Sequence, residues 1–297
     1  MKEFNVINDT LSYEKGVDAG FSRTSYDTVV RIPKFYYKVV SSGATLELWI
    51  STGPMEGYTL HPAFEGKDFI YISRYLSGSS YDTKSGISCK RSLNRPTWRT
   101  GARAKGTNWD LINVAVHSAV QMLYIVEFAN WDSQTCIGTG SSSSTSGITD
   151  PMNYHTGAYN NCVQYRGIEN LWNTNHTIID GVNVNGQTVY YCTDRSLFAD
   201  GTSTNYTDIG FTVPSSDSFI KELGDCYQAP WLLFAKTAGG AAGTYIPDKQ
   251  NGMSNGWKML VRGGPGTSTS NGLFAQSMNS GYSATVSDYT SRLIFMP

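Results

Sequence analysis

Short apolar runs separated by Gly- and Ser-rich turns make up most of the chain, and this pattern predicts short β-strands. The clearest runs are residues 32–40, 69–75, 188–192, 231–235 and 257–261. From residue 111 to 124, however, apolar side chains recur three and four positions apart, which predicts an amphipathic helix with its N-cap in residues 107–110. His117 falls off that apolar stripe, so we expect it to be solvated or hydrogen-bonded and not a ligand. Short strands with at least one clear helix favour an α+β fold.

Composition narrows the classes of protein. The 23 basic residues nearly balance the 24 acidic ones, which argues against a nucleic-acid-binding surface. No apolar run approaches membrane-spanning length, and residues 1–16 lack the apolar core of a signal peptide. We therefore expect neither nucleic acid nor membrane insertion, and folding in a bacterial cytoplasm. Residues 138–147 (GTGSSSSTSG) have the composition of a loop tip, and we interpret them as a loop and not a domain boundary.

The residues that could carry chemistry favour structural roles. The five cysteines are dispersed without metal-ligand spacing, so we expect buried thiols. The basic run 91–105 is typical of a solvated face or of ion pairs with acidic residues elsewhere. We interpret Arg166 and Glu169 as a structural ion pair, and Asp132 as a capping residue near the helix end. No hydrolase elbow, phosphate loop or zinc-binding motif occurs. We therefore predict no catalytic residue, metal ligand or cofactor.

Six blocks in order suggest a family. They are IPKFYYK (32–38), STGPMEGYTLHPAF (51–64), GARAKGTNWD (101–110), LYIVEFANWDSQ (123–134), YRGIENLW (165–172) and a closing LVRGG…NGLF…SRL from residue 260 to 293. Their order resembles variable proteins of diversity-generating retroelements, which are phage tail or receptor-binding proteins with the C-type lectin fold of the formylglycine-generating-enzyme-like branch. The resemblance implies a small set of antiparallel strands flanked by two helices, with irregular insertions. It also implies a short arm at residues 1–28, one domain at 29–297 and a variable region at about 257–297.

The closing block contains a polar segment with no Lys, Arg or Glu between residues 263 and 291. If Leu260, Leu273, Phe274, Leu293 and Phe295 are buried, the polar residues between them emerge as loops held at both ends. A Ser-, Thr-, Asn- and Tyr-rich surface on a rigid frame is how antibody paratopes bind. We expect Met278 to be an anchor. We predict outward-pointing ligand-binding side chains at Thr267, Ser268, Thr269, Ser270, Gln276, Ser277, Asn279, Ser280, Tyr282, Ser283, Thr285, Ser287 and Asp288.

The expected function is recognition without catalysis. The resemblance implies a phage or prophage tail-tip adhesin, located in the virion tail and often a homotrimer, whose C-terminal surface binds a host-surface protein or glycan. One alternative is a structural virion or surface protein whose loops pack against neighbouring subunits. A second is a formylglycine-generating-type oxidase, which needs a reactive cysteine pair near the C-terminal end. Because no cysteine follows Cys226, we do not expect that oxidase activity.

Overall fold

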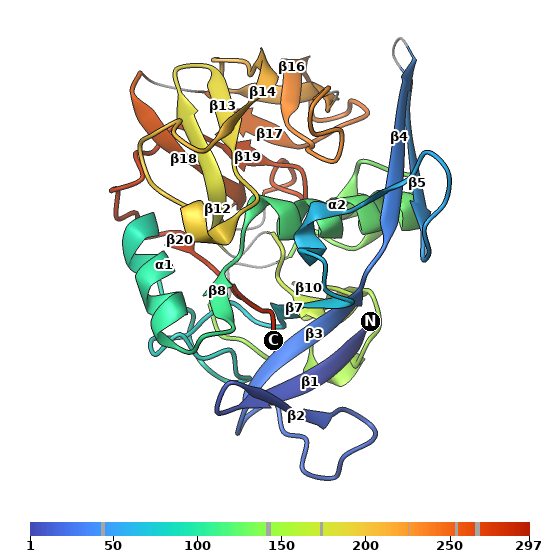
Figure 1. The fold of residues 1–297 in the computed structure, drawn as a ribbon, viewed down its shortest axis with the longest axis vertical. Helices are drawn as coiled ribbons and strands as arrows, with labels where there is room; N and C mark the ends of the chain where they lie inside the picture. The colour runs from blue at the N-terminus through green and yellow to red at the C-terminus, as the bar shows by residue number, and fades with distance from the viewer. Residues whose placement is uncertain (43–44, 141–143, 173–174, 225, 253–254, 265–267) are drawn as a thin grey trace.

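Strands dominate the architecture (Figure 1). The computed structural model describes residues 1–297 except 43–44, 141–143, 173–174, 225, 253–254 and 265–267. With 36% of the chain in strands and 13% in helices, the fold is mainly β-sheet with few helices. The strands are more numerous than the small set that we expected. Within the described residues no helix has the length and apolarity needed to cross a membrane.

One sheet joins the two ends of the chain. Its strand order is β2 (Thr10–Glu14), β1 (Lys2–Ile7), β3 (Asp27–Pro33), β7 (Phe69–Ser73), β21 (Leu293–Phe295) and β8 (Trp109–Leu111), with every pair antiparallel. The expected boundary at residue 28 therefore falls inside β3, and the expected arm contributes two strands to this sheet. Phe4 and Phe295 belong to the same buried cluster, so the first and last strands share a core.

A larger sheet carries most of the C-terminal half. It contains β14 (Thr207–Thr212), β13 (Thr188–Tyr191), β12 (His176–Asn185), β18 (Trp257–Gly263), β19 (Gln276–Ser277), β17 (Lys249–Asn251), β15 (Ser218–Leu223) and β16 (Ala235–Gly240) in that order, while β20 (Tyr289–Thr290) pairs with β12. Most pairs are antiparallel, but β12–β20 and β17–β19 are parallel. The sheet places the end of β18 next to the start of β12, because Gly263 is opposite His176.

The remaining strands of the described residues form two three-stranded sheets. The first consists of β4 (Tyr36–Ser42), β5 (Thr45–Ser51) and β6 (Thr59–Leu60), and its β4–β5 hairpin projects from the body (Figure 1). The second consists of β9 (Gly157–Tyr159), β10 (Cys162–Tyr165) and β11 (Ile168–Glu169). Three 3₁₀ turns, η1 (Pro62–Phe64), η2 (Asp150–Met152) and η3 (Arg195–Leu197), lie in connections.

The described helices are α1 (Arg95–Ala104), α2 (Val114–Phe128) and the short α3 (Ser133–Cys136). The expected helix is present as α2, but its expected N-cap is wrong. Residues 109–111 form β8, and Asn113 caps α2 by accepting a hydrogen bond from the backbone N of Val116 at 3.0 Å. The side chain of Asp110 therefore does not cap α2.

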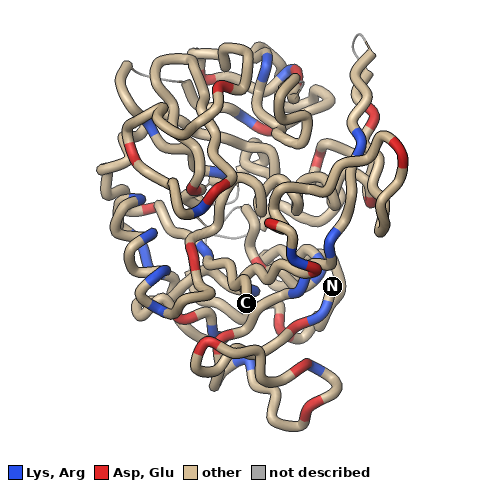
Figure 2. Tube along the Cα trace, viewed as in Figure 1, with Lys and Arg blue, Asp and Glu red and all other residues tan. Residues whose placement is uncertain are grey.

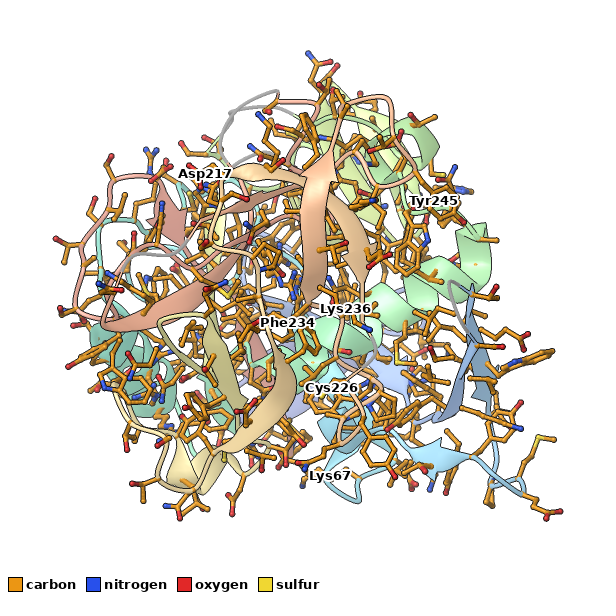
Figure 3. All side chains as sticks on the ribbon, turned by 90° about the horizontal axis from the view of Figure 1, so that it is seen from above. Lys67, Asp217, Cys226, Phe234, Lys236 and Tyr245 are labelled. Atoms are coloured by element: carbon orange, nitrogen blue, oxygen red, sulfur yellow. The ribbon has the colours of Figure 1, made fainter. Side chains whose placement is uncertain are left out.

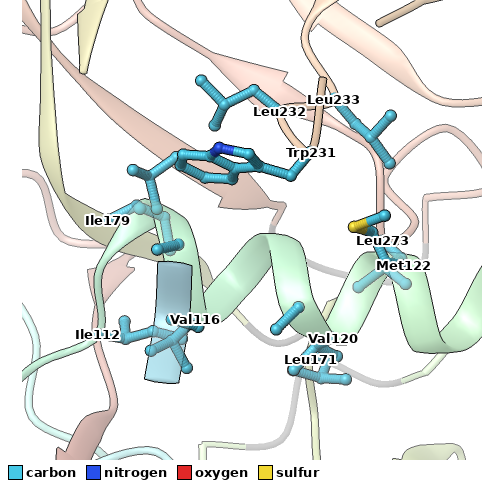
Figure 4. Packing of buried hydrophobic residues seen from close by; sticks show 14 of the residues in the cluster. Ile112, Val116, Val120, Met122, Leu171, Ile179, Trp231, Leu232, Leu233 and Leu273 are labelled. Carbon is cyan, nitrogen blue, oxygen red and sulfur yellow. The ribbon is translucent and has the colours of Figure 1, made fainter. Parts of the chain in front are cut away.

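Helix α2 is buried on nearly every side, not on one stripe. From Val114 to Met122 every side chain is buried, and Leu273 and Trp231 pack beside it (Figure 4). We expected His117 to be either solvated or hydrogen-bonded, and it is not solvated. Its exposed fraction is 3%, and its Nε2 has no hydrogen-bond partner among the described residues. Only the solvated alternative is wrong: β12, β5 and η1 all contact the helix, whereas an amphipathic pattern describes a single covered face.

Most expected strands are confirmed, with two differences. The run 32–40 is divided between β3 and β4, and the run 231–235 is not a strand before Ala235. Trp231 to Phe234 are nonetheless buried. The carbonyl groups of Trp231 and Leu233 accept hydrogen bonds from the side chains of Ser118 and Arg262, and that of Phe234 accepts one from Gly224 N, directly after β15. From above, Phe234 lies near the centre of the molecule and Tyr245 nearer its edge (Figure 3).

Candidate functional site

The polar C-terminal segment is held at its start by a buried arginine. Arg262, on β18, donates hydrogen bonds to the carbonyl oxygens of Leu233 at 2.8 Å and Phe274 at 3.1 Å, and to Gln276 Oε1 at 3.2 Å. Its guanidinium also lies 5.0 Å from the centre of the Phe234 ring. Burial lowers the pKa of Arg262 to about 9. One side chain thus ties β18, β19 and the segment between them to the core.

A buried carboxylate closes the first loop of the segment. Asp248 accepts a hydrogen bond from the backbone N of Gly272 and another, at 2.8 Å, from the backbone N of Phe274. Burial raises the pKa of Asp248 to about 6, although the backbone donors oppose this shift. A Cβ at Gly272 would lie 2.6 Å from an Asp248 oxygen, so only glycine fits this turn. Leu273 and Phe274 are buried on the far side of it.

Residues 268–271 form the described part of the first loop. Thr269 is exposed and Ser268 is half-buried. The Ser268 carbonyl oxygen accepts a hydrogen bond from Gln134 Nε2 at 2.7 Å, so this loop is attached to α3. Asp132 caps α3 through the backbone N of Gln134 and Thr135, which confirms its expected role.

Residues 279–288 form the second loop, and backbone hydrogen bonds fix it at three points. The Ser280 oxygen accepts from Met259 N at 3.0 Å, the Tyr282 oxygen from Arg95 N at 3.2 Å, and the Asp288 oxygen from His176 N at 2.9 Å. The exposed residues are Asn279, Ser283, Thr285 and Ser287, and the half-buried ones are Ser280, Tyr282 and Asp288. This loop lies between α1 on one side and the β12–β18 pair on the other.

Three of the predicted outward-pointing residues are buried instead, and the prediction is wrong for them. Gln276 and Ser277 form β19, where Gln276 Oε1 accepts from Arg262 Nη1 and from Ala235 N. Ser270 lies behind the first loop, and its carbonyl oxygen accepts from Lys249 N at 2.8 Å. These residues are buried because their polar groups form hydrogen bonds with other buried groups of the protein. Met278 is buried, as expected, and Thr267 lies outside the described residues.

Nine predicted residues are therefore at least partly accessible, and we call them the C-terminal polar surface. They are Ser268, Thr269, Asn279, Ser280, Tyr282, Ser283, Thr285, Ser287 and Asp288. Asp288 carries their only carboxylate. Its Oδ2 is 3.9 Å from His176 Nε2, and burial lowers the pKa of His176 despite this neighbour. The surface is thus made of hydroxyl, amide and phenol groups with one negative charge.

An arginine network beneath the second loop was only partly anticipated. Arg99 donates to both oxygens of Asp180, at 2.6 and 2.7 Å, and to Asp200, while Arg95 donates to Asp200 at 2.6 Å. These two arginines are buried, although they belong to the basic run along α1 (Figure 2). The ion-pair reading of that run is confirmed for them. The signal was the four-residue spacing of the two arginines, which places both on one face of the helix.

The expected ion pair between Arg166 and Glu169 is wrong, because each has a different partner. Arg166 Nη2 pairs with Glu127 at 2.6 Å, on the surface. Glu169 is buried and accepts from the backbone N of Gly147 and of Thr149. The left-handed backbone at Arg166, with φ of 50°, separates the two side chains.

The cysteines and the metal-ligating side chains do not gather into a site. Cys89, Cys162, Cys192 and Cys226 are buried thiols, as expected, and Cys136 is partly exposed. Burial raises the pKa of Cys162 to about 11, which suppresses its thiolate. Among the described residues no three His, Cys, Asp or Glu side chains are arranged to hold a metal ion.

No protein-family model matches the chain, and the search of curated proteins finds no significant relative.

Proposed function

We propose that this protein is a non-catalytic recognition protein whose C-terminal polar surface binds a host-surface molecule. In this proposal it is a phage or prophage tail-tip adhesin with the C-type lectin fold of the formylglycine-generating-enzyme-like branch. The observation that carries the proposal is that residues 262–292 alternate between buried anchors and accessible polar side chains. Buried side chains hold both ends and the middle of the segment, while nine polar residues between them reach solvent.

The anchors support side-chain exchange on the surface. Arg262, Asp248 and Phe274 hold the backbone of the first loop from the core, and none of their hydrogen bonds involves an accessible side chain of the polar surface. Replacing Ser283, Thr285 or Ser287 therefore leaves these contacts intact. The mixture of Tyr, Ser, Thr and Asn resembles that of antibody paratopes, where rigid aromatic groups and adaptable hydroxyls share the contact.

The secondary structure supports the fold part of the proposal at the level of strands and helices. Helices α1 and α2 flank antiparallel strands, and β21 returns to the sheet that begins the chain. These features agree with the sequence resemblance at the level of strands and helices. The family itself is part of the proposal.

The alternatives make different predictions. A structural protein would bury Thr269 and residues 279–287 against a neighbouring subunit, and its binding to cells would not depend on them. An oxidase of the formylglycine-generating type would need reactive thiols near this surface. The last cysteine, Cys226, is buried beneath β14, where its Sγ bonds to Ile209 O at 2.9 Å.

The test combines genetics with binding. The flanking DNA should encode a reverse transcriptase and hold a near-identical copy of the last hundred or so bases, with mismatches confined to adenines. Labelled protein should bind cells of a susceptible strain, and a Ser283→Ala/Thr285→Ala/Ser287→Ala variant should lose binding while it keeps its melting temperature. Cell binding that is unchanged in this folded variant would contradict the proposal, whatever the flanking DNA contains.

A further inference from the structure

A polar pocket lies near the C-terminal end of α1 and is separate from the C-terminal polar surface. It has a volume of about 330 Å³ and is lined by side chains from α1, β8 and η3, including Arg103, Asp110 and Arg195. This volume is at the small end of the range for ligand-binding pockets. Residues 103–110 and residues 195–196 are distant in sequence and together build it, so the pocket exists only in the folded chain.

Asp110 is the acceptor in this pocket. Its side chain is 5% exposed, and its Oδ1 accepts from its neighbour's backbone, Leu111 N, at 2.8 Å. Arg103 Nε lies 3.2 Å from both carboxylate oxygens. Burial raises the pKa of Asp110 in spite of Arg103. The carboxylate is therefore held with fewer hydrogen bonds than its two oxygens can accept.

Arg195 is the donor opposite it. Its Nη1 lies 3.8 Å from Asp110 Oδ2, which is too long for a direct hydrogen bond. The hydrogen bonds that its side chain gives to described residues both come from Nε and go to Glu65, at 2.9 and 3.2 Å. A hydroxyl group placed beside both atoms can bridge them, because it donates to the carboxylate while it accepts from the guanidinium.

Hydrogen bonds within the protein fix the groups that line the pocket. Arg103 Nη2 donates to the Arg195 carbonyl oxygen at 2.7 Å, which joins α1 to η3. Asp194 caps η3 by accepting from Ser196 N at 2.9 Å and from Ser196 Oγ at 2.6 Å. Fixed donors and acceptors reduce the entropy that a ligand must overcome.

The charges select the chemical class of the ligand. The two arginines are balanced by Asp110 and Glu65, so a net anion or cation would leave one charge unmatched. A zwitterion would have to separate Arg103 from Asp110. A neutral polyhydroxylated molecule needs neither change, since each of its hydroxyls both donates and accepts.

We propose that this pocket binds a monosaccharide unit through a pair of neighbouring hydroxyl groups, one of which bridges Asp110 Oδ2 and Arg195 Nη1. The site is independent of the C-terminal polar surface. It gives the protein a carbohydrate contact that sequence variation between residues 268 and 288 leaves unchanged.

Saturation-transfer NMR with D-galactose, D-mannose and D-glucose tests the proposal on the full chain. At least one hexose should show transfer at millimolar concentration, and Arg195→Met should weaken its binding roughly tenfold or more, the loss expected for one hydrogen bond to a charged group. The matched control is Arg166→Met, which also removes a partly exposed Arg–Glu pair and should leave hexose binding intact.

Other outcomes overturn the proposal. They are transfer to none of the three hexoses, equal weakening by Arg166→Met and Arg195→Met, or transfer from alanine and not from any hexose. Because Asp110→Asn alters a buried strand, it is used second, with circular dichroism to confirm folding. The Ser283→Ala/Thr285→Ala/Ser287→Ala variant should bind hexose normally, so failure of this inference and failure of the adhesin proposal are distinguished.

Discussion

The carboxylate of Asp248 accepts a hydrogen bond from the backbone N of Phe274 at 2.8 Å, and both residues are buried. This bond joins the segment before β18 to the turn after the first polar loop. It holds that turn in place while the neighbouring side chain of Thr269 stays in solvent. The frame and the surface of the C-terminal region can therefore be tested separately.

Asp248→Asn should destabilise the protein by about 1–3 kcal/mol, because the amide replaces one acceptor with a donor that faces backbone N–H groups. Urea unfolding measures the loss, and hydrogen exchange at Gly272 and Phe274 should become faster. Asp68→Asn is the matched control, since Asp68 makes an exposed pair with Lys34. An unchanged free energy of unfolding in Asp248→Asn would contradict the clamp.

The buried and exposed members of the predicted site should behave differently. Gln276→Ala leaves Ala235 N without its acceptor and removes one of the two acceptors of Arg262 Nη1, and should cost about 1–3 kcal/mol. Thr285→Ala on the exposed loop should change stability by no more than about 0.5 kcal/mol. Thermal melts of the two variants give the comparison, and similar losses in both would show that the loop is part of the frame.

Loss of Arg99 should be among the most damaging single changes on α1. The residue pairs with the buried Asp180 and the half-buried Asp200, and without it both carboxylates lose their bidentate partner, at a cost of about 3–5 kcal/mol. Arg99→Lys should not restore stability, because an ammonium cannot make the forked contact. Arg91→Ala, at an exposed position of the same basic run, is the control. The expectation fails if both variants unfold at the same urea concentration.

Stability should fall as the solution becomes mildly acidic. Burial lowers the pKa of His61 to about 3 and also lowers that of His117 and His176 below 6.5. Below pH 6.5 the unfolded chain takes up protons that the folded protein refuses, so stability that is present above 6.5 is lost as pH falls. Each histidine contributes a slope of roughly 1 kcal/mol per pH unit.

Asp248 opposes this trend in part. Burial raises its pKa from 3.8 to about 6, so its contribution is fully present below 3.8 and is lost as pH rises through 6. Urea unfolding at several pH values from neutral downward should still show a net decrease, since three histidines act against the carboxylates of Asp248 and Asp110. His61→Gln should reduce the slope by roughly 1 kcal/mol per pH unit. A flat profile would mean that these histidines are protonated in the folded protein.

Sequence patterns predicted the strands around residues 69–75, 188–192 and 257–261 because their period reflects burial of one or both faces of a sheet. The same reasoning failed for residues 231–234, where the carbonyls of Trp231 and Leu233 bond to the side chains of Ser118 and Arg262. Such long-range partners leave no local signal. Composition also could not separate Gln276 and Ser277 from exposed neighbours, since a polar side chain that satisfies buried backbone looks the same in sequence as one in water.

The pocket at Asp110 was hidden for a related reason. Residues 107–110 match the start of a helix by local pattern, yet Trp109 to Leu111 pair with β21 from the far end of the chain. The strand pairing shifts the helix cap to Asn113, and the role of Asp110 follows from that shift. Only the tertiary structure brings Arg195 to it.

Strand β21 lies between β7 and β8 (Figure 1), and it follows the polar segment in the chain. A frameshift or a stop codon anywhere in residues 268–288 would therefore delete the strand that joins these two neighbours. A chain with such an error should fail to fold and be degraded. Folding itself thus acts as a quality filter, because a chain without the native residues 293–295 cannot complete the sheet between β7 and β8.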